Sequence, residues 1–463
     1  MSDKRNVLGK GDIYDARSLG MAKVIILGIQ HMFAMFGATV LVPKLTGLDV
    51  STTLLFAGLG TLLFHLLTKG KVPAFLGSSF AFLGGYMTIA PKLGSAPGVP
   101  NTEMLPYACF GVACAGLLYL LLALLIRLFG TGRVMKFFPP IVTGPIIIAI
   151  GLTLSPSAID NCNTDWLIAV VAILLVVICN IWGKGMIKII PIIIGVVGSY
   201  LLAIVLGRVD FTDVSQAAWV GLPIHWEETA FSILAGGDAS KLINSVITIM
   251  PIALATMVEH IGDMSAISST VGINYIKEPG LHRTLLGDGL ATILASLFGA
   301  PANTTYGENT GVLSMTRVYD PLVVRLAAVF AILLSFSPKV AAVIRCMPDA
   351  TVGGVSLVLY GMISAVGVRN IVETRVDFGK TRNVLIAALI LVLSIGIANS
   401  AAGAVAFHIG DVNINLSGLA VGALAGILLN AVLPGKDYVF DEEVPSETGV
   451  DFSVRNKEKQ GKR

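Results

Sequence analysis

The chain has 463 residues, of which 55% are apolar and only 13% are charged, and its mean hydropathy is +0.82. A water-soluble domain of this length needs far more charge to cover its surface, so this composition excludes a soluble globular protein. The net charge is only +3, and we expect no nucleic-acid partner. The five cysteines show neither a paired framework nor a CxxC metal spacing.

Apolar runs recur along most of the chain, and each approaches the roughly 20 residues that a helix needs to cross a bilayer. We therefore predict an all-α polytopic membrane protein with about fourteen transmembrane segments. In chain order, the predicted spans are 22–42, 51–68, 73–91, 105–129, 134–155, 164–183, 187–207, 241–265, 283–299, 303–316, 321–337, 349–368, 382–399 and 415–433.

Basic residues support this alternation of spans and loops. With the N-terminus inside, most of the 32 Lys and Arg fall on the inner side, as the positive-inside rule expects. Examples are the segments from Lys4 to Lys23, from Arg127 to Lys136 and from Arg369 to Arg382. We predict cytoplasmic termini, no cleaved signal peptide and a disordered charged tail from Lys436 to Arg463.

The two halves of the chain resemble each other at an offset of about 228 residues. Gln30-His31 in the first span corresponds to Glu259-His260 in the eighth, and Ser78-Ser79-Phe80 in the third corresponds to Thr304-Thr305-Tyr306 in the tenth. Because each half then holds an odd number of spans, the second copy is inverted. Inverted repeats are typical of secondary transporters.

The third and tenth spans are too polar and too rich in Gly or Pro for uninterrupted helices. They read PAFLGSSFAFLGGY (73–86) and FGAPANTTYGENTG (298–311). We predict that each is a short extended stretch leading into a half-helix. Irregular backbone at membrane depth is tolerated only where it is buried in protein or lines a cavity, so corresponding breaks in both halves indicate the binding site.

Three acidic residues lie in predicted spans, where an ionised carboxylate is expensive and is usually functional. Glu259 and Asp263 are four residues apart and share one helix face, whereas His260 points about 100° away and is predicted to pack or to bond a neighbouring helix. Glu308 falls in the first turn of the predicted half-helix, where the helix dipole favours its ionised form. We expect Glu259 to respond to protons and Glu308 to accept hydrogen bonds from substrate.

The remaining groups at the breaks indicate the kind of substrate. Backbone N–H groups near Phe80 and Gly307 are left free to donate, and the rings of Phe80 and Tyr306 offer faces for stacking. A planar, neutral heterocycle with N–H and C=O edges satisfies the acids, the amides and the rings together. A mineral anion would not suit the acids.

Four motifs also resemble those of the nucleobase–ascorbate transporter family. They are QHMFAMFGATVLVP (30–43), GSSFAF (77–82), EHIGD (259–263) and NTTYGENTGVLSMTR (303–317). Within that family the chain is most similar to bacterial uracil permeases, and the similarity extends from residue 20 to residue 435.

The resemblance implies two inverted repeats of seven spans, arranged as a core domain that moves against a gate domain. The implied segments are a cytoplasmic N-terminal segment (1–21), core (22–130 and 241–337), gate (131–207 and 338–435), an extracellular loop (208–240) and a cytoplasmic tail (436–463). It further implies a proton-coupled nucleobase importer of the cell membrane, with the proton as coupling ion, no cofactor, and a homodimer through the gate.

The resemblance also assigns roles to individual positions. The substrate-binding residues it implies are Glu259, Glu308, Phe80, Gly307, Tyr306, Ala38 and Tyr360, the last three lining the pocket. The groups implied in proton coupling are Glu259, Asp263 and His31, with His31 supporting the acids by a hydrogen bond. Asp263 departs from the uracil permeases, which carry His there, and matches many purine carriers.

Our prediction from the sequence is a proton-coupled uracil symporter that works by alternating access. A xanthine or purine permease of the same family is the alternative that Asp263 raises. An anion exchanger of related architecture is an alternative from another class. A membrane enzyme is disfavoured, because the sequence lacks HExxH, a phosphate-binding Gly-rich loop with Lys and a His cluster.

Overall fold

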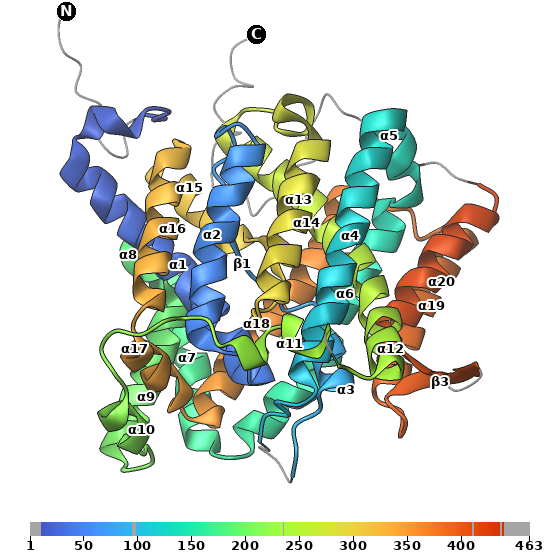
Figure 1. Cartoon of the computed structure of the whole chain (residues 1–463). Helices are drawn as coiled ribbons and strands as arrows, with labels where there is room; N and C mark the ends of the chain where they lie inside the picture. Colours follow the sequence, from blue (N-terminus) through green and yellow to red (C-terminus); the bar gives the residue numbers. More distant parts are fainter. Residues whose placement is uncertain (1–10, 95–98, 235, 410–411, 436–437, 439–463) are drawn as a thin grey trace, which may run out of the picture.

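The computed structural model describes residues 11–94, 99–234, 236–409, 412–435 and 438, so most of the predicted tail lies outside the described residues. The long helices are α1 (Met21–Thr46), α2 (Val50–Leu67), α4 (Leu105–Phe129), α6 (Pro140–Cys162), α7 (Trp166–Trp182), α9 (Pro191–Val205), α12 (Ala239–Ile249), α13 (Ala253–Val271), α14 (Leu281–Leu297), α16 (Pro321–Ser335), α18 (Asp349–Glu373), α19 (Thr381–Ala398) and α20 (Gly418–Val432). The long helices pack together, and α1 and α20 are tilted relative to α2 and α4 (Figure 1).

Shorter elements connect or interrupt these helices. The short helices are η1 (Ala16–Leu19), α3 (Leu83–Ile89), α5 (Thr131–Val134), η2 (Met135–Phe137), α8 (Met186–Ile189), α10 (Thr212–Gln216), η3 (Trp226–Glu228), α11 (Phe231–Leu234), η4 (Met250–Ile252), η5 (Ile276–Gly280), α15 (Gly307–Thr316) and α17 (Pro338–Arg345). The strands are β1 (Leu76–Ser78), β2 (Asn303–Thr305), β3 (Ala404–Ile409) and β4 (Val412–Ser417).

Local sequence sets several of these boundaries. Gly47 ends α1 in the left-handed region, and the Asp49 carboxylate then caps α2 by accepting a hydrogen bond from the backbone N–H of Thr52. Asp320 caps α16 in the same way, with Pro321 at the first helical position. The predicted eighth span is interrupted by η4, where Pro251 lacks the N–H that would continue the α-helix.

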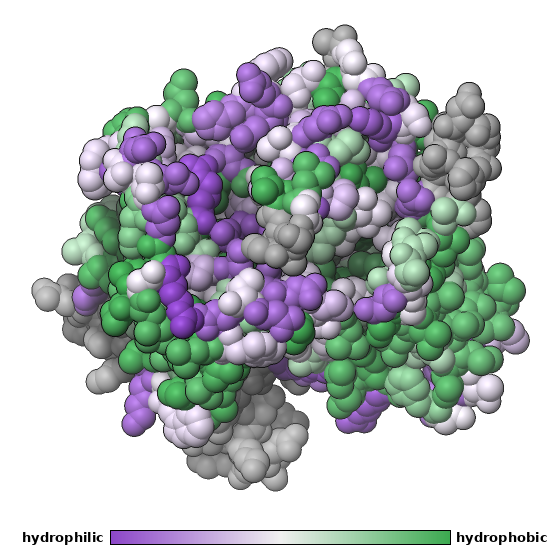
Figure 2. Space-filling view, turned by 90° about the horizontal axis from the view of Figure 1, so that it is seen from below, coloured by the Kyte–Doolittle hydropathy of each residue, from purple (hydrophilic) through white to green (hydrophobic). Residues whose placement is uncertain are grey.

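Among the described residues, seven helical stretches are long and apolar enough to cross a membrane, or eight if the bent pair α16–α17 forms one span. The helices α7, α9 and α20 are apolar but shorter. Viewed from below, hydrophilic residues gather across the middle of the molecule and hydrophobic residues gather on its flanks (Figure 2). These features indicate several membrane crossings, but they do not confirm the predicted number of fourteen.

The helices of the two halves pack against one another reciprocally. By their order in the two halves, α2 corresponds to α14 and α4 corresponds to α16, and the contacts run from α2 to α16 and from α4 to α14. In the same way, α7 packs on α9 and α18 in the first half, while α19 packs on α20 and α6 in the second. This exchange of partners is the arrangement that a two-fold axis between repeats produces.

The two segments predicted to be extended meet in the interior. Strands β1 and β2 are antiparallel, with Leu76 opposite Thr305, Gly77 opposite Thr304 and Ser78 opposite Asn303. The predicted extended stretches are therefore confirmed, and each continues into a short helix, α3 or α15. The pairing satisfies backbone groups that would otherwise be unpaired at this depth.

The structure corrects the sequence prediction at one further place. Strands β3 and β4 form an antiparallel hairpin, and α20 begins only at Gly418, whereas the sequence analysis predicted a span from residue 415. The missed signal was the β-branched residues on either side of Gly410-Asp411, a dipeptide that favours hairpins. The chain is thus predominantly, but not entirely, α-helical.

Candidate substrate site

The candidate site lies where β2 and α15 meet the acidic face of α13. Helix α13 packs against both elements. Its two acids, Glu259 and Asp263, are each partly buried. A Cβ atom placed on Gly307 would stand 3.7 Å from Oδ1 of Asp263, so this face of α13 lies directly beside the start of α15. Gly307 itself is exposed although Tyr306, Asn309 and Thr310 are buried, so its backbone borders open space.

The first turn of α15 contains Glu308. The prediction that this residue stands at the start of a half-helix is confirmed, since α15 runs from Gly307 to Thr316. Its side chain lies outside the described part of the structure. The first N–H groups of any helix have no partner within the helix, so this end of α15 offers hydrogen-bond donors and partial positive charge.

The segment after β1 supplies the aromatic side of the site. Phe80 is buried between β1 and α3, and its ring meets the ring of Tyr360 edge-on, with centroids 6.0 Å apart and planes at 76°. Tyr360 comes from α18 and Ala38 comes from α1, and both are buried. The Phe80–Tyr360 contact therefore joins the segment after β1 to a helix from the C-terminal part of the chain.

Tyr306 fixes the position of β1 relative to β2. Its hydroxyl donates to the carbonyl oxygen of Ser78 at 2.7 Å and lies 3.4 Å from the hydroxyl of Thr39. Its ring packs on Gly77, where an added Cβ would come within 2.6 Å of the ring carbons. Only glycine allows this approach, so Gly77 and Tyr306 fix how β1 lies on β2.

His31 is completely buried in α1 and connects to α15. The side-chain amide of Asn309 lies 3.2 Å from Nδ1 of His31 and donates to the carbonyl oxygen of His31 at 3.2 Å. The sequence analysis expected a hydrogen bond from His31 to the acids. The partner that the structure records is instead the residue next to Glu308, so His31 contacts the half-helix that carries this acid.

The structure adds one acid that the sequence analysis missed. Asp288, on α14, is completely buried. Its Oδ1 accepts a hydrogen bond from the backbone N–H of Thr305 at 3.0 Å, and its Oδ2 lies 3.2 Å from Nδ1 of His260. The signal was available, because Asp288 falls within the predicted span 283–299 and an acid at bilayer depth is rare.

These contacts form a continuous polar chain through the interior. His260 Nε2 pairs with the Thr284 hydroxyl at 3.0 Å, which confirms the prediction that His260 bonds a neighbouring helix. The hydroxyl of Thr305 lies 3.3 Å from His260 Nδ1 and donates to Oδ2 of Asp263 at 3.0 Å. Asp288 and Asp263 therefore lie on either side of His260 and Thr305, and the approach of Asp288 Oδ2 to His260 Nδ1 is an electrostatic contact rather than a hydrogen bond.

No group of three or more His, Cys, Asp or Glu side chains in the described ranges could hold a metal ion. The site thus consists of carboxylates, backbone amides and aromatic rings. These groups can bind a flat polar ring and exchange protons.

Comparison with known proteins identifies the family. Residues 22–403 match the sequence model of a group described as the permease family. The chain belongs to this family. It is 42% identical over 435 residues to a uracil permease of Bacillus caldolyticus, covering 92% of this chain and 95% of the relative. It is 40% identical over 450 residues to a uracil permease of Bacillus subtilis strain 168, covering 94% and 97%. The resemblance to uracil permeases is confirmed.

Family membership identifies the chain as a multi-pass membrane transporter rather than an enzyme. Among solved structures, the transmembrane domain of a cyanobacterium bicarbonate transporter, BicA, superposes with a TM-score of 0.59 at 16% sequence identity. That match covers 83% of this chain and 97% of the BicA domain. At this identity the likeness concerns the fold alone, so it does not favour bicarbonate or another anion as the substrate.

Proposed function

We propose that this protein is a proton-coupled symporter that imports uracil across the plasma membrane by alternating access. The observation that carries the proposal is the acidic face of α13 beside the exposed backbone of Gly307, where β1 and β2 cross. The uracil permeases that share about two fifths of their sequence with this chain support the choice of a nucleobase.

Uracil suits the chemistry of the site. Its ring N–H groups would donate to the carboxylates of Glu259 and Glu308, and its carbonyl oxygens would accept from the backbone N–H groups at Phe80 and Gly307. The ring would lie against Phe80, with Tyr306, Ala38 and Tyr360 completing the pocket. A site built from donors and acceptors rejects compounds that leave its buried polar groups unpaired.

Proton coupling follows from the placement of the acids. A partly buried carboxylate that stays ionised while it moves within the membrane carries a large electrostatic penalty, which protonation removes. We propose that Glu259 accepts the proton from the extracellular side. We also propose that His31 holds α15 in position through its contact with Asn309. Asp263 connects Glu259's helix face, through Thr305 and His260, to the buried Asp288. Binding of proton and substrate would then favour the same conformation.

Alternating access would move a core (22–130 and 241–337) against a gate (131–207 and 338–435). The Phe80–Tyr360 contact joins the proposed core to the proposed gate at the site, so relative movement would open or close it. The reciprocal packing of the two halves supports two inverted repeats of seven spans. We further propose cytoplasmic termini, an extracellular loop over 208–240, and a homodimer formed through the gate.

The main alternative is a xanthine or purine permease, because Asp263 replaces the His expected in the uracil branch. In this structure Asp263 accepts a hydrogen bond from Thr305, so its role can be internal rather than in substrate selection. Competition of labelled uracil uptake by unlabelled uracil, xanthine and guanine separates the two. Stronger inhibition by xanthine or guanine than by the same concentration of unlabelled uracil would contradict our substrate assignment.

The decisive experiment is uptake into proteoliposomes. We expect purified protein to accumulate labelled uracil when the outside is more acidic than the inside, and to stop when an ionophore collapses the pH gradient. Accumulation that does not respond to the ionophore would contradict proton coupling. A thermal-shift screen of nucleobases provides an independent measure of binding, because a ligand of the folded state raises its melting temperature.

A further inference from the structure

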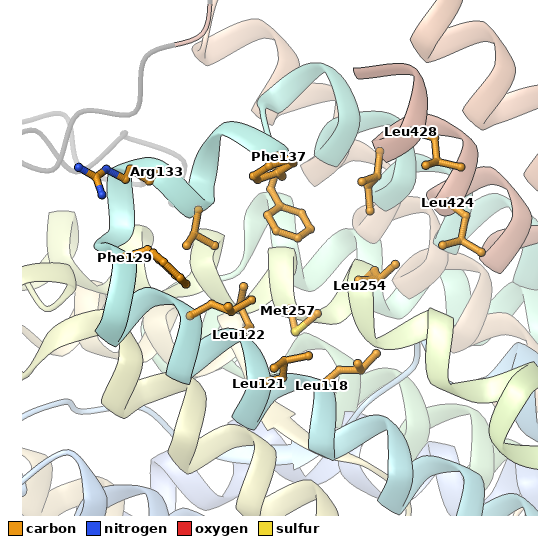
Figure 3. Close-up of a pocket in the computed structure, with 14 residues that line it drawn as sticks. Leu118, Leu121, Leu122, Phe129, Arg133, Phe137, Leu254, Met257, Leu424 and Leu428 are labelled. Carbon is orange, nitrogen blue, oxygen red and sulfur yellow. The ribbon is translucent and has the colours of Figure 1, made fainter. Parts of the chain in front are cut away.

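A second cavity, of about 570 Å³, is lined by none of the candidate substrate-site residues. Its walls come from α4, the start of α13 and α20, and the segment formed by α5 and η2 closes one end (Figure 3). Every lining residue is apolar except Arg133. Leu121 and Leu122 on α4 lie across from Leu424 and Leu428 on α20. A cavity with these walls suits a hydrocarbon chain and not a polar solute.

The rim of this cavity faces the surroundings of the protein. Leu121 is 50% exposed, Phe129 is 54% exposed and Leu428 is 62% exposed. Helix α4 is among the candidate membrane spans, so its exposed leucines are positioned to meet lipid. The cavity is therefore open toward the acyl-chain region of the bilayer.

The closed end carries positive charge. Arg133 lies at that end and is exposed, and Lys136 is exposed on the same short segment, whose Val134 and Met135 are buried. The positive-inside rule puts this segment at the cytoplasmic surface. Cationic residues at that level attract the anionic headgroups of the inner leaflet.

We propose that this cavity binds an anionic glycerophospholipid, with an acyl chain between α4 and α20 and the phosphate group on Arg133. An apolar slot that ends in a cation at headgroup depth matches the two ends of such a lipid. An inorganic phosphate ion is polar throughout and would gain no favourable contact with the leucine side chains that line the cavity. A second copy of the chain would have to insert side chains into the slot and cover Arg133.

The lipid would also regulate transport, a step that rests on the proposed function. Helices α4 and α13 belong to the proposed core, whereas α20 and the α5–η2 segment belong to the proposed gate. An acyl chain held between the proposed core and the proposed gate contacts both domains. It therefore binds more tightly to one arrangement of core and gate than to the other and shifts the equilibrium between them.

The binding test uses full-length protein in nanodiscs of dioleoyl phosphatidylglycerol and dioleoyl phosphatidylcholine. After mild detergent extraction, the retained phosphatidylglycerol is quantified by mass spectrometry. We expect Arg133→Gln and the cavity-filling Leu424→Trp each to lower the retained phosphatidylglycerol several-fold. The matched control is Arg127→Gln, because Arg127 is also exposed near the end of α4 but does not line the cavity.

Several outcomes would overturn the proposal. Equal retention in wild type, Arg133→Gln and Leu424→Trp would remove the site, and so would loss in Arg127→Gln to the same extent as in Arg133→Gln. A disulfide between two copies through Leu424→Cys would mean that a second chain covers the cavity. Circular dichroism and melting temperature show whether each variant is folded. If Leu424→Trp is not folded, Leu428→Trp is used as the cavity-filling variant in its place.

The regulatory step has its own readout. We expect wild-type uracil uptake to be faster in phosphatidylglycerol than in phosphatidylcholine vesicles, with the difference lost in Arg133→Gln. Equal rates in both lipids would overturn the regulatory step. If wild type transports no uracil in either lipid, the proposed function fails instead, and the retention measurement still decides whether the lipid site exists.

Discussion

The two segments that cross in the interior have similar backbones but different chemistry around them. The N–H of Leu76 in β1 donates to the hydroxyl of Thr61 on α2 at 2.9 Å. The N–H of Thr305 in β2 donates to the carboxylate of Asp288 on α14 at 3.0 Å. Helices α2 and α14 correspond in the two halves, so a neutral hydroxyl in one half stands where the other half has an ionisable acid.

The two helix side chains therefore differ in what they can do: Thr61 only stabilises the backbone, whereas Asp288 can also ionise. The Thr61 hydroxyl accepts from the N–H of Leu76, while its own proton faces the carbonyl oxygens of Ala57 at 2.8 Å and Leu76 at 3.2 Å, and the group cannot change charge. Asp288 adjoins His260, which leads through Thr305 to Asp263. Corresponding segments of the two halves thus have their backbone N–H groups bonded by helix side chains, whereas the ionisable acceptor occurs in the second half only.

The largest effect is expected from Glu259→Gln, because substrate and proton binding are both assigned to this acid. Losing a partly buried charged acceptor costs about 1–3 kcal/mol, so we expect initial uracil uptake to fall roughly ten- to a hundredfold. Glu103→Gln serves as the control, since Glu103 is an exposed acid paired with Lys241. Unchanged uptake across pH in Glu259→Gln would remove this residue from the mechanism.

Asp288→Asn and Thr61→Val test the comparison directly. Asn keeps an acceptor for the N–H of Thr305 but cannot ionise, so we expect retained uracil binding with a flattened pH profile of uptake. Thr61→Val leaves the N–H of Leu76 unpaired, which should lower stability by about 1–3 kcal/mol without moving the pH profile. A pH profile that shifts in Thr61→Val but not in Asp288→Asn would reverse our assignment.

Two glycines in the crossing segments should respond differently to Ala. At Gly77 the new Cβ would lie 2.6 Å from the ring of Tyr306, and overpacking of this kind costs about 1–3 kcal/mol. At Gly307 the nearest atom is Oδ1 of Asp263 at 3.7 Å, which is an ordinary contact. We expect a lower melting temperature for Gly77→Ala only, and weaker uracil binding with unchanged stability for Gly307→Ala. Equal melting temperatures would contradict the packing argument.

His31→Leu should have a moderate effect. It removes the imidazole that contacts the Asn309 amide, so α15 loses one contact to α1. We expect a several-fold weaker apparent affinity for uracil and little change in the maximal rate. Normal affinity in kinetic uptake measurements would exclude a supporting role for His31. His65→Leu provides a comparison, because His65 is also buried but bonds the carbonyl oxygen of Ala74.

The smallest effect is expected from Glu278→Gln, outside the spans. The hydrogen bond and charge of Lys71 hold the pKa of Glu278 below its ordinary value, so their stabilisation is present at neutral pH and is lost as pH falls through the lowered pKa. Because both side chains are exposed, the pair contributes little. Uptake and melting temperature at pH 7 should match wild type, and a clear loss would assign the pair a role in coupling.

The sequence alone was sufficient for features that depend on local composition. Hydropathy predicted the membrane helices because the preference of an apolar run for the bilayer does not depend on which helices it packs against. The Gly-rich, polar stretches at 73–86 and 298–311 predicted extended backbone, and β1 and β2 confirm it. The position of Glu308 in the first turn of α15 was predictable for the same reason, since helix starts are encoded locally.

Only the tertiary structure decided which of these pieces touch. The bond from Tyr306 to Ser78, the link from Asp288 to Thr305 and the apolar cavity between α4 and α20 join segments far apart in the chain. Composition does not specify such pairings, because they depend on how whole helices pack. The sequence determined that acids and broken helices exist at membrane depth, and the packing of the two halves determined that they meet.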